Sequence, residues 1–118
     1  MPDTPDPAAM ERLHPLDVTP SELLGILGSA DAPLLVDVRA LGEYTGGHIP
    51  GTRLLPLPEL AARASELPRE RRILCVCRSG RRSERAAEHL RSLGYSAGNL
   101  LGGMVAWTGP VEEGGARP

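Results

Sequence analysis

The chain has 118 residues, enough for one domain, and 41% of them are hydrophobic, which suffices to fill a core although only 3% are aromatic. The net charge of −2 argues against a globally basic nucleic-acid-binding protein, and all 13 cationic residues are arginines. No apolar run approaches the roughly 18 residues of a membrane span, and no signal peptide opens the chain. We therefore expect a cytoplasmic protein with reduced thiols and neither a nucleic-acid nor a membrane partner.

The two ends of the chain differ in composition from the segment between them. Residues 1–14 are polar and rich in proline, without hydrophobic periodicity, and we expect a disordered N-terminal tail. Residues 110–118 are rich in glycine and charged side chains, and we expect a flexible C-terminal tail. The folded domain is predicted to span residues 15–109.

The domain is predicted to begin with a short strand at residues 16–18, followed by a helix. Thr19 is a suitable N-cap for that helix, Pro20 fits its first position, and Glu22 lies three residues after the cap. A continuous apolar run at residues 34–38 then predicts a strand that is buried on both faces.

The middle of the domain continues the alternation of strands and helices. Residues 52–55 predict a third short strand, and residues 58–66 predict a short helix. Residues 72–76 predict a fourth strand, the most apolar of the predicted strands.

The last elements of the domain include its most regular helical pattern, at residues 83–93. Gly94 stands where a glycine commonly ends a helix. Residues 99–101 predict a fifth strand, and a final helical turn is expected to end near Trp107. The alternation predicts an α/β fold with a roughly five-stranded parallel sheet and helices on both faces.

Ligands in such folds bind beyond the carboxyl ends of the strands, and a cysteine stands at one of these ends. Cys77 ends the fourth strand, and a loop containing Gly80 leads into a helix. Loop amides can surround the sulfur, the helix N-terminus adds about half a unit of positive charge, and Arg78, Arg81 and Arg82 add full charges. These effects favour a thiolate and a bound anion, which suits either sulfur transfer or phosphoryl transfer.

The spacing from cysteine to arginine separates these two reactions. Four residues stand between Cys77 and Arg82, whereas cysteine phosphatases and arsenate reductases have five, which cradle a tetrahedral oxyanion. Five residues do separate Cys75 from Arg81, but Cys75 lies inside the predicted strand, and we interpret that match as chance. The smaller ring of Cys77 suits one additional sulfur atom better than a phosphate.

Four motifs occur in the order and spacing that are typical of one family. They are LVDVR at residues 35–39, EYTGGHIPG at 43–51, CRSGRRS at 77–83 and LGGMVAW at 101–107. With these motifs, the segment from Asp17 to Trp107 resembles the rhodanese family of single-domain sulfurtransferases.

The resemblance implies that Cys77 is the catalytic residue. Cys77 would take a sulfane sulfur from thiosulfate or a related persulfide donor, hold it as a persulfide, and pass it to cyanide or a thiol, with ping-pong kinetics and no cofactor. A dianion such as thiosulfate suits the cationic loop. The substrate-binding candidates are Arg78, Ser79, Gly80, Arg81, Arg82 and Ser83.

Other polar residues are assigned supporting roles. Asp37 and Arg39 follow the second strand, and we expect them to hold the loop rather than take part in chemistry. The three histidines lack ligand spacing, so no metal site is expected.

Two alternatives to an enzyme acting on a small donor stay open. A sulfur-relay or regulatory module that accepts sulfur from a partner protein would have the same sequence. A cysteine phosphatase or arsenate reductase is less favoured because of the loop size.

Overall fold

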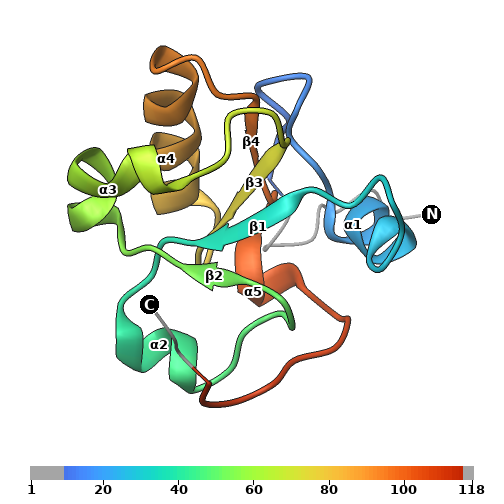
Figure 1. The fold of residues 1–118 in the computed structure, drawn as a ribbon. Coiled ribbons are helices and arrows are strands. Elements are labelled where there is room, and N and C mark those ends of the chain that lie inside the picture. The colour runs from blue at the N-terminus through green and yellow to red at the C-terminus, as the bar shows by residue number, and fades with distance from the viewer. Residues whose placement is uncertain (1–9, 116–118) are drawn as a thin grey trace.

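Four parallel strands form the central sheet of this computed structural model, which describes residues 10–115 (Figure 1). In order across the sheet they are β2 (Arg53–Leu54), β1 (Leu34–Asp37), β3 (Ile73–Val76) and β4 (Ala97–Asn99). The central strands β1 and β3 are the two most apolar runs, as burial on both faces requires. Cys75 pairs with Val36 on one side and with Asn99 on the other, so the carboxyl ends of these three strands lie at one edge.

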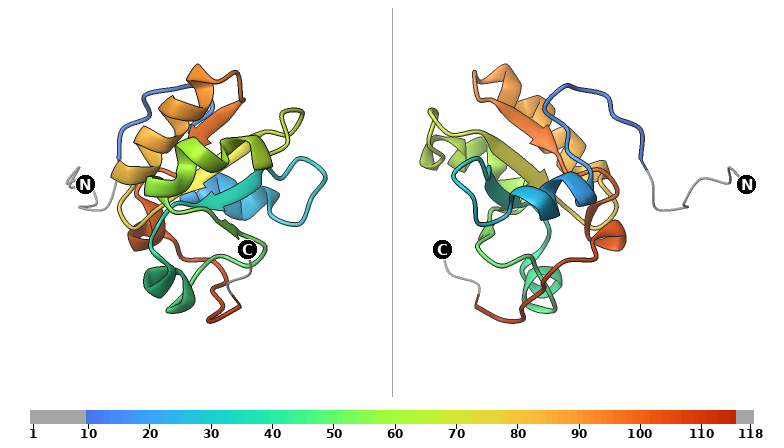
Figure 2. Two further views of the ribbon diagram at one scale, coloured as in Figure 1. Left: turned by 60° about the vertical axis from the view of Figure 1, so that its left-hand side comes forward. Right: turned by 90° about the vertical axis from the view of Figure 1, so that its right-hand side faces the viewer.

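Helices cover both faces of the sheet (Figures 1 and 2). One face packs against α3 (Leu57–Arg63), its continuation in the 3-10 turn η1 (Ala64–Glu66), and α4 (Arg81–Ser92). The other face packs against α1 (Pro20–Ile26) and α5 (Gly103–Ala106). The predicted α/β fold is therefore confirmed.

Within residues 10–115, no helix has the length and apolar character needed to cross a membrane.

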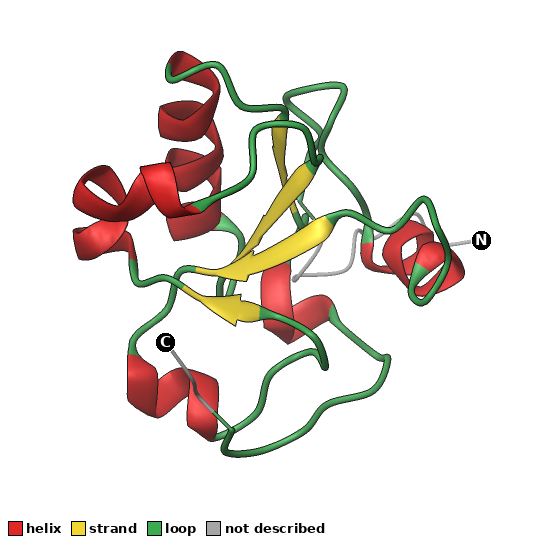
Figure 3. Ribbon diagram, viewed as in Figure 1, coloured by secondary structure: helices red, strands yellow, loops and turns green. Residues whose placement is uncertain are grey.

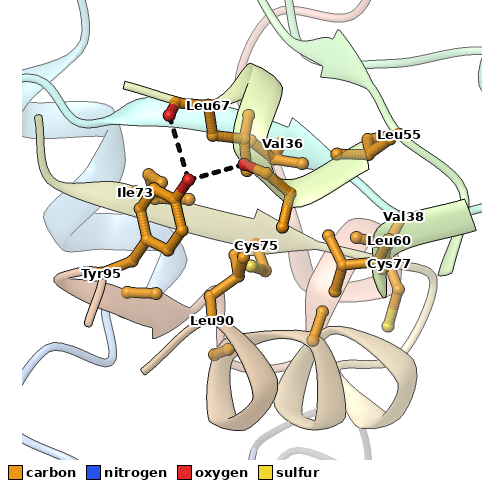
Figure 4. Close-up of a cluster of buried hydrophobic side chains, with 14 residues drawn as sticks. Val36, Val38, Leu55, Leu60, Leu67, Ile73, Cys75, Cys77, Leu90 and Tyr95 are labelled. Atoms are coloured by element: carbon orange, nitrogen blue, oxygen red, sulfur yellow. Dashed lines mark hydrogen bonds between the residues drawn. The ribbon is translucent and has the colours of Figure 1, made fainter. Parts of the chain in front are cut away.

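Alternate residues of the buried strands supply two apolar cores. Val36 and Cys75 face α3 and α4, whereas Leu35 and Leu74 face α1 and α5. Residues two apart on a strand point to the same face, so Cys77 follows Cys75 into the first core. Figure 4 shows Cys75 inside this core and Cys77 at its end.

The sheet has four strands rather than the five expected, because the segment at residues 16–18 does not extend it. Val18 and Leu100 form one isolated parallel bridge, in which the amide of Val18 donates to the carbonyl of Asn99 at 3.0 Å. The preceding Asp17 is buried, and its carboxylate accepts three backbone hydrogen bonds. Because Asp17 makes these hydrogen bonds, residues 16–18 contact the chain at the end of β4 through a single bridge and do not form a fifth strand beside it.

Other element bounds also differ from those predicted. The last strand lies at residues 97–99 rather than 99–101, since this register pairs it with Ile73–Cys75. The helix α4 begins at Arg81, two residues earlier than predicted, and Gly94 follows its end with a φ of 95°. A short helix, α2 (Leu41–Thr45), was not predicted, because five residues are too few for an apolar periodicity (Figure 3).

Residues 10–14 contact the domain, although the sequence assigns them to the N-terminal tail. Two backbone amides of this segment donate to the carboxylate of Asp17, at 3.0 Å each. Arg12 pairs with Glu22 at 2.9 Å, and Glu22 also completes the predicted capping box with Thr19. The packed part of the chain therefore begins before residue 15.

The segment after residue 109 also contacts the domain. Glu112 and His48 exchange two backbone hydrogen bonds of 2.9 Å, and their side chains lie 3.2 Å apart. The His48 ring also stacks on the Tyr44 ring, with centroids 3.8 Å apart. Residues 1–9 and 116–118, the remainder of the two predicted tails, lie outside the described residues.

The close approach of β4 to the residues before α1 requires glycine at position 98. A Cβ on Gly98 would lie 1.9 Å from the carbonyl oxygen of Leu16, and a backbone atom cannot move aside cheaply. We expect Gly98→Ala to lower the free energy of unfolding by at least about 2 kcal/mol in urea denaturation. Gly25→Ala is the matched control, because a Cβ on this exposed helical glycine meets no atom within 4 Å, and it should stabilise the domain slightly. Equal stability of the two variants would contradict the close approach.

Candidate active site

Cys77 is the first residue after β3 and stands at the carboxyl edge of the sheet. The loop after it is only three residues long, because α4 already begins at Arg81. Gly80 makes this short turn possible, since its φ of 98° lies in the left-handed region that favours glycine. The loop therefore sets the cysteine directly before the N-terminus of a 12-residue helix.

Two polar groups contact the sulfur of Cys77. The amide of Gly80 donates to Sγ at 3.0 Å, and the hydroxyl oxygen of Ser83 lies 3.2 Å from Sγ. Cys77 is 1% exposed, and Ser83 is fully buried. An amide and a hydroxyl at a buried sulfur are suited to stabilising negative charge on it.

The helix α5 also holds the loop in place. The amides of Met104 and Val105 donate to the carbonyl oxygens of Cys77 and Arg78, both at 2.9 Å. A Cβ on Gly103 would lie 2.4 Å from the carbonyl oxygen of Cys77, so this contact requires glycine. Gly103, the second glycine of the LGGMVAW motif, thus has a physical role that the sequence alone does not reveal.

The three loop arginines have different environments. Arg78 and Arg81 are exposed, and neither forms an ion pair within residues 10–115. Arg82 is held by Glu43 of α2 in a two-pronged ion pair, with N···O distances of 2.8 and 2.9 Å. Ser79, the remaining substrate-binding candidate, is exposed beside them.

Glu43 is not among the site residues predicted from the sequence, although it belongs to the EYTGGHIPG motif. Hydrogen bonds from Arg82 lower the pKa of Glu43 to about 2, against a smaller opposing effect of burial. The same pair raises the pKa of the Arg82 guanidinium. Glu43 and Arg82 are therefore both charged over the whole neutral range, and each cancels the other's charge.

Asp37 and Arg39 form a buried ion pair at the end of β1. The guanidinium of Arg39 donates to both carboxylate oxygens of Asp37 at 2.8–3.1 Å, and it also donates to the carbonyl oxygen of Gly47 at 2.8 Å. These contacts tie β1 to the segment around α2, which carries Glu43. Both residues thus hold the segment that pairs with Arg82 rather than contacting the sulfur.

Comparison with known proteins identifies the family. The family model described as "Rhodanese-like domain" matches residues 19–110. The chain belongs to this family. Among solved structures, a rhodanese-like domain protein from Staphylococcus aureus is similar, with a TM-score of 0.78 and 30% identity, over 84% of this chain and 98% of that chain.

Two curated relatives of this rhodanese-like chain have names that refer to sulfur. One, from Allochromatium vinosum, is named as a sulfurtransferase and is 40% identical over 82 residues, which are 69% of this chain and 77% of that protein. The other, YrkF from Bacillus subtilis, is named as a sulfur carrier protein and is 43% identical over 79 residues. The match covers 66% of this chain but 43% of YrkF, so this chain spans less than half the length of that relative.

The second cysteine of the rhodanese-like domain lies in the core, as predicted. Cys75 has no exposed surface, and burial raises the pKa of its thiol to about 12. A thiol with this pKa is protonated and unreactive at neutral pH. Of the two cysteines, only Cys77 contacts polar groups of the loop.

The ion pair between Glu43 and Arg82 predicts a stability that depends on pH. Because the folded pKa of Glu43 is about 2 and its ordinary value is 4.5, the pair contributes fully above pH 4.5 and is lost as the pH falls towards 2. We expect Glu43→Gln to lower the free energy of unfolding at pH 7 by up to about 1 kcal/mol, the range for a partly screened pair. Urea denaturation should show this difference shrinking between pH 4.5 and 3.

Glu88→Gln is the matched control, since Glu88 is an exposed residue of α4. Its difference from the parent protein should stay small at every pH. A Glu43→Gln difference that is constant from pH 7 to pH 3 would contradict the role of the pair.

Proposed function

We propose that this rhodanese-like domain is a sulfurtransferase that carries a sulfane sulfur on Cys77, with thiosulfate or a related persulfide as the donor. The observation that carries the proposal is the Cys77 sulfur at the start of α4, with the amide of Gly80 directed at it. The relatives named as a sulfurtransferase and a sulfur carrier support the same chemistry.

The reaction has two halves that share one covalent intermediate. In the first, the thiolate of Cys77 attacks the outer sulfur of thiosulfate, the S–S bond of the donor breaks, and sulfite leaves with the bonding electron pair. In the second, an acceptor such as cyanide or a thiol attacks the outer sulfur of the persulfide, and Cys77 leaves as a thiolate. The Gly80 amide and the Ser83 hydroxyl lie where they stabilise negative charge on the Sγ atom of Cys77 in both half-reactions.

The charge distribution of the loop supports an anionic donor. Arg82 is neutralised by Glu43, whereas Arg78 and Arg81 are exposed beside the cysteine. No carboxylate within residues 10–115 forms an ion pair with Arg78 or Arg81, so both cations are available to a dianion that approaches Cys77. We assign donor binding to Arg78 and Arg81, and a positioning role to Arg82.

A sulfur-relay module is the second candidate function. The relative YrkF is named as a sulfur carrier protein, and a carrier uses the same persulfide. Such a module accepts its sulfur from a partner protein, so it would exchange sulfur with that partner faster than with thiosulfate.

Formation of a persulfide on Cys77 can be measured directly. Incubation of the protein with thiosulfate should raise the intact mass by about 32 Da, the mass of one sulfur atom, and Cys77→Ser should abolish the gain. Cys75→Ser is the control and should retain the gain, because Cys75 is buried and protonated.

Two results would contradict the proposed function. The first is the absence of any mass gain with thiosulfate and with small persulfide donors. The second is hydrolysis of an aryl phosphate that is lost in Cys77→Ser, which would favour the phosphatase alternative.

The assignment of donor binding predicts a difference among arginine variants. Arg78→Gln should raise the KM for thiosulfate about fivefold, which corresponds to about 1 kcal/mol of screened attraction, and should change kcat little. Arg71→Gln is the control, because Arg71 is exposed before β3, at the opposite end of the strand from Cys77. Equal KM values for the two variants would show that Arg78 does not attract the donor.

A further inference from the structure

Asn99, the last residue of β4, is a buried polar residue beside the Cys77 loop that the proposed function does not use. It is 2% exposed. Its Nδ2 donates to the carbonyl oxygen of Gly80 at 2.9 Å, and its Oδ1 lies 2.5 Å from the hydroxyl oxygen of Ser83. One amide therefore joins the residue that precedes α4 to a residue in the first turn of that helix.

The backbone of Asn99 is held independently of the loop. Its amide donates to Oδ1 of the buried Asp17 at 3.0 Å, and its carbonyl oxygen accepts from the amide of Val18 at 3.0 Å. The Asp17 carboxylate is itself held by two backbone amides of the segment before it. The side-chain amide of Asn99 is therefore held in position and in turn positions Gly80 and Ser83 through its two hydrogen bonds.

The contacts of Asn99 determine the direction of the Ser83 hydroxyl. Because the carbonyl of Gly80 only accepts hydrogen bonds, the NH2 group of Asn99 must face it, and the oxygen of Asn99 must face Ser83. That oxygen carries no proton, so Ser83 donates its single proton to Asn99. The Ser83 oxygen then presents a lone pair to Cys77 Sγ, 3.2 Å away, which can accept from a thiol.

A thiolate at Cys77 reverses this arrangement. It has no proton to donate and gains from a hydrogen-bond donor, and the Ser83 hydroxyl is within reach. The sulfur of Cys77 and the oxygen of Asn99 thus compete for the one proton of Ser83.

We propose that Asn99 is a positioning residue that controls the Ser83 hydroxyl, directing its proton to Asn99 while Cys77 is a thiol and releasing it to the sulfur when the thiolate forms. This rests on the proposed function, in which the thiolate of Cys77 is both nucleophile and leaving group. In the second half-reaction the acceptor bonds to the outer sulfur, the S–S bond of the persulfide breaks, and its electron pair moves to Cys77 Sγ. Ser83 donates a hydrogen bond to this developing charge and keeps its proton.

Other charged or titratable groups belong to the elements packed around Cys77. They are Cys75 on β3, Arg78 in the loop, Arg81 and Arg82 on α4, Glu43 on α2, Asp37 on β1 and Asp17 behind Asn99. These groups remain in every variant used below, so a difference between variants that depends on Ser83 isolates the hydroxyl.

The test measures the rate of Cys77 alkylation by iodoacetamide against pH, read at the Cys77 peptide by mass spectrometry. In the parent protein Ser83→Ala should move the midpoint of this profile only slightly upward, because the thiolate gains the hydroxyl at the expense of Asn99. In the Asn99→Leu protein, which lacks the competing oxygen, Ser83→Ala should move the midpoint upward by about one pH unit more. Equal shifts in the two backgrounds would overturn the proposal, since a merely structural Asn99 would leave the contribution of the hydroxyl unchanged.

A second measurement uses the native side chain and does not depend on the folding of Asn99→Leu. The 13C chemical shift of the Asn99 side-chain carbonyl should change with pH at the same midpoint as Cys77 alkylation, because Asn99 loses its donor there. The step should be absent in Ser83→Ala. A carbonyl shift that stays constant through the alkylation midpoint would overturn the proposal.

Both measurements use the resting protein without a sulfur donor, so their outcome is independent of the mass gain with thiosulfate. Failure of the mass gain would remove the proposed function, whereas failure of the hydroxyl test would remove only the role of Asn99.

Discussion

The edge of the sheet that carries Cys77 depends on one backbone contact, between the start of α5 and the loop after β3. Two amides of α5 bind the carbonyl oxygens of Cys77 and Arg78, and Gly103 allows the two chains to approach this closely. In the loop held by these two hydrogen bonds, the amide of Gly80 donates to the sulfur of Cys77. A hydrogen-bonded backbone, rather than flexible side chains, thus places the donor at Sγ, and such a donor needs little reorganisation when charge develops.

The arginines at this edge of the sheet are of two kinds: some form ion pairs with carboxylates, and others are exposed without such a partner among residues 10–115. The ion pair of Asp37 with Arg39 ties the end of β1 to Gly47, after α2, and the ion pair of Glu43 with Arg82 ties α2 to α4. In each pair the carboxylate neutralises the arginine, so neither pair adds much to the electrostatic field at the surface of the protein. The two exposed arginines that have no such partner among residues 10–115, Arg78 and Arg81, keep their positive charge beside Cys77. A net charge of −2 therefore coexists with a locally cationic site.

A series of hydrogen-bonded buried polar groups connects residues outside the Cys77 loop to the sulfur. It runs from Asp17 through Asn99 and Ser83 to Cys77, and all four residues are buried. Buried polar groups require partners, and here each one finds them in the next member of the series or in a backbone group. The cost of burying these groups is offset by hydrogen bonds, and the geometry around Cys77 is correspondingly well defined.

The sequence by itself determined the fold class and the loop that carries Cys77, because these depend on residues that are adjacent or close in the chain. Periodicity and turn residues record the strands and helices, and the order cysteine, glycine, helix is contiguous. Only the tertiary structure decided the partners of these elements: that Glu43 neutralises Arg82, 39 residues away, and that Asn99 contacts Ser83, 16 residues away. It also decided that residues 16–18 cap the sheet instead of joining it. These outcomes follow from strand register and from the close approach of glycine backbones, and neither leaves a periodic pattern in the sequence.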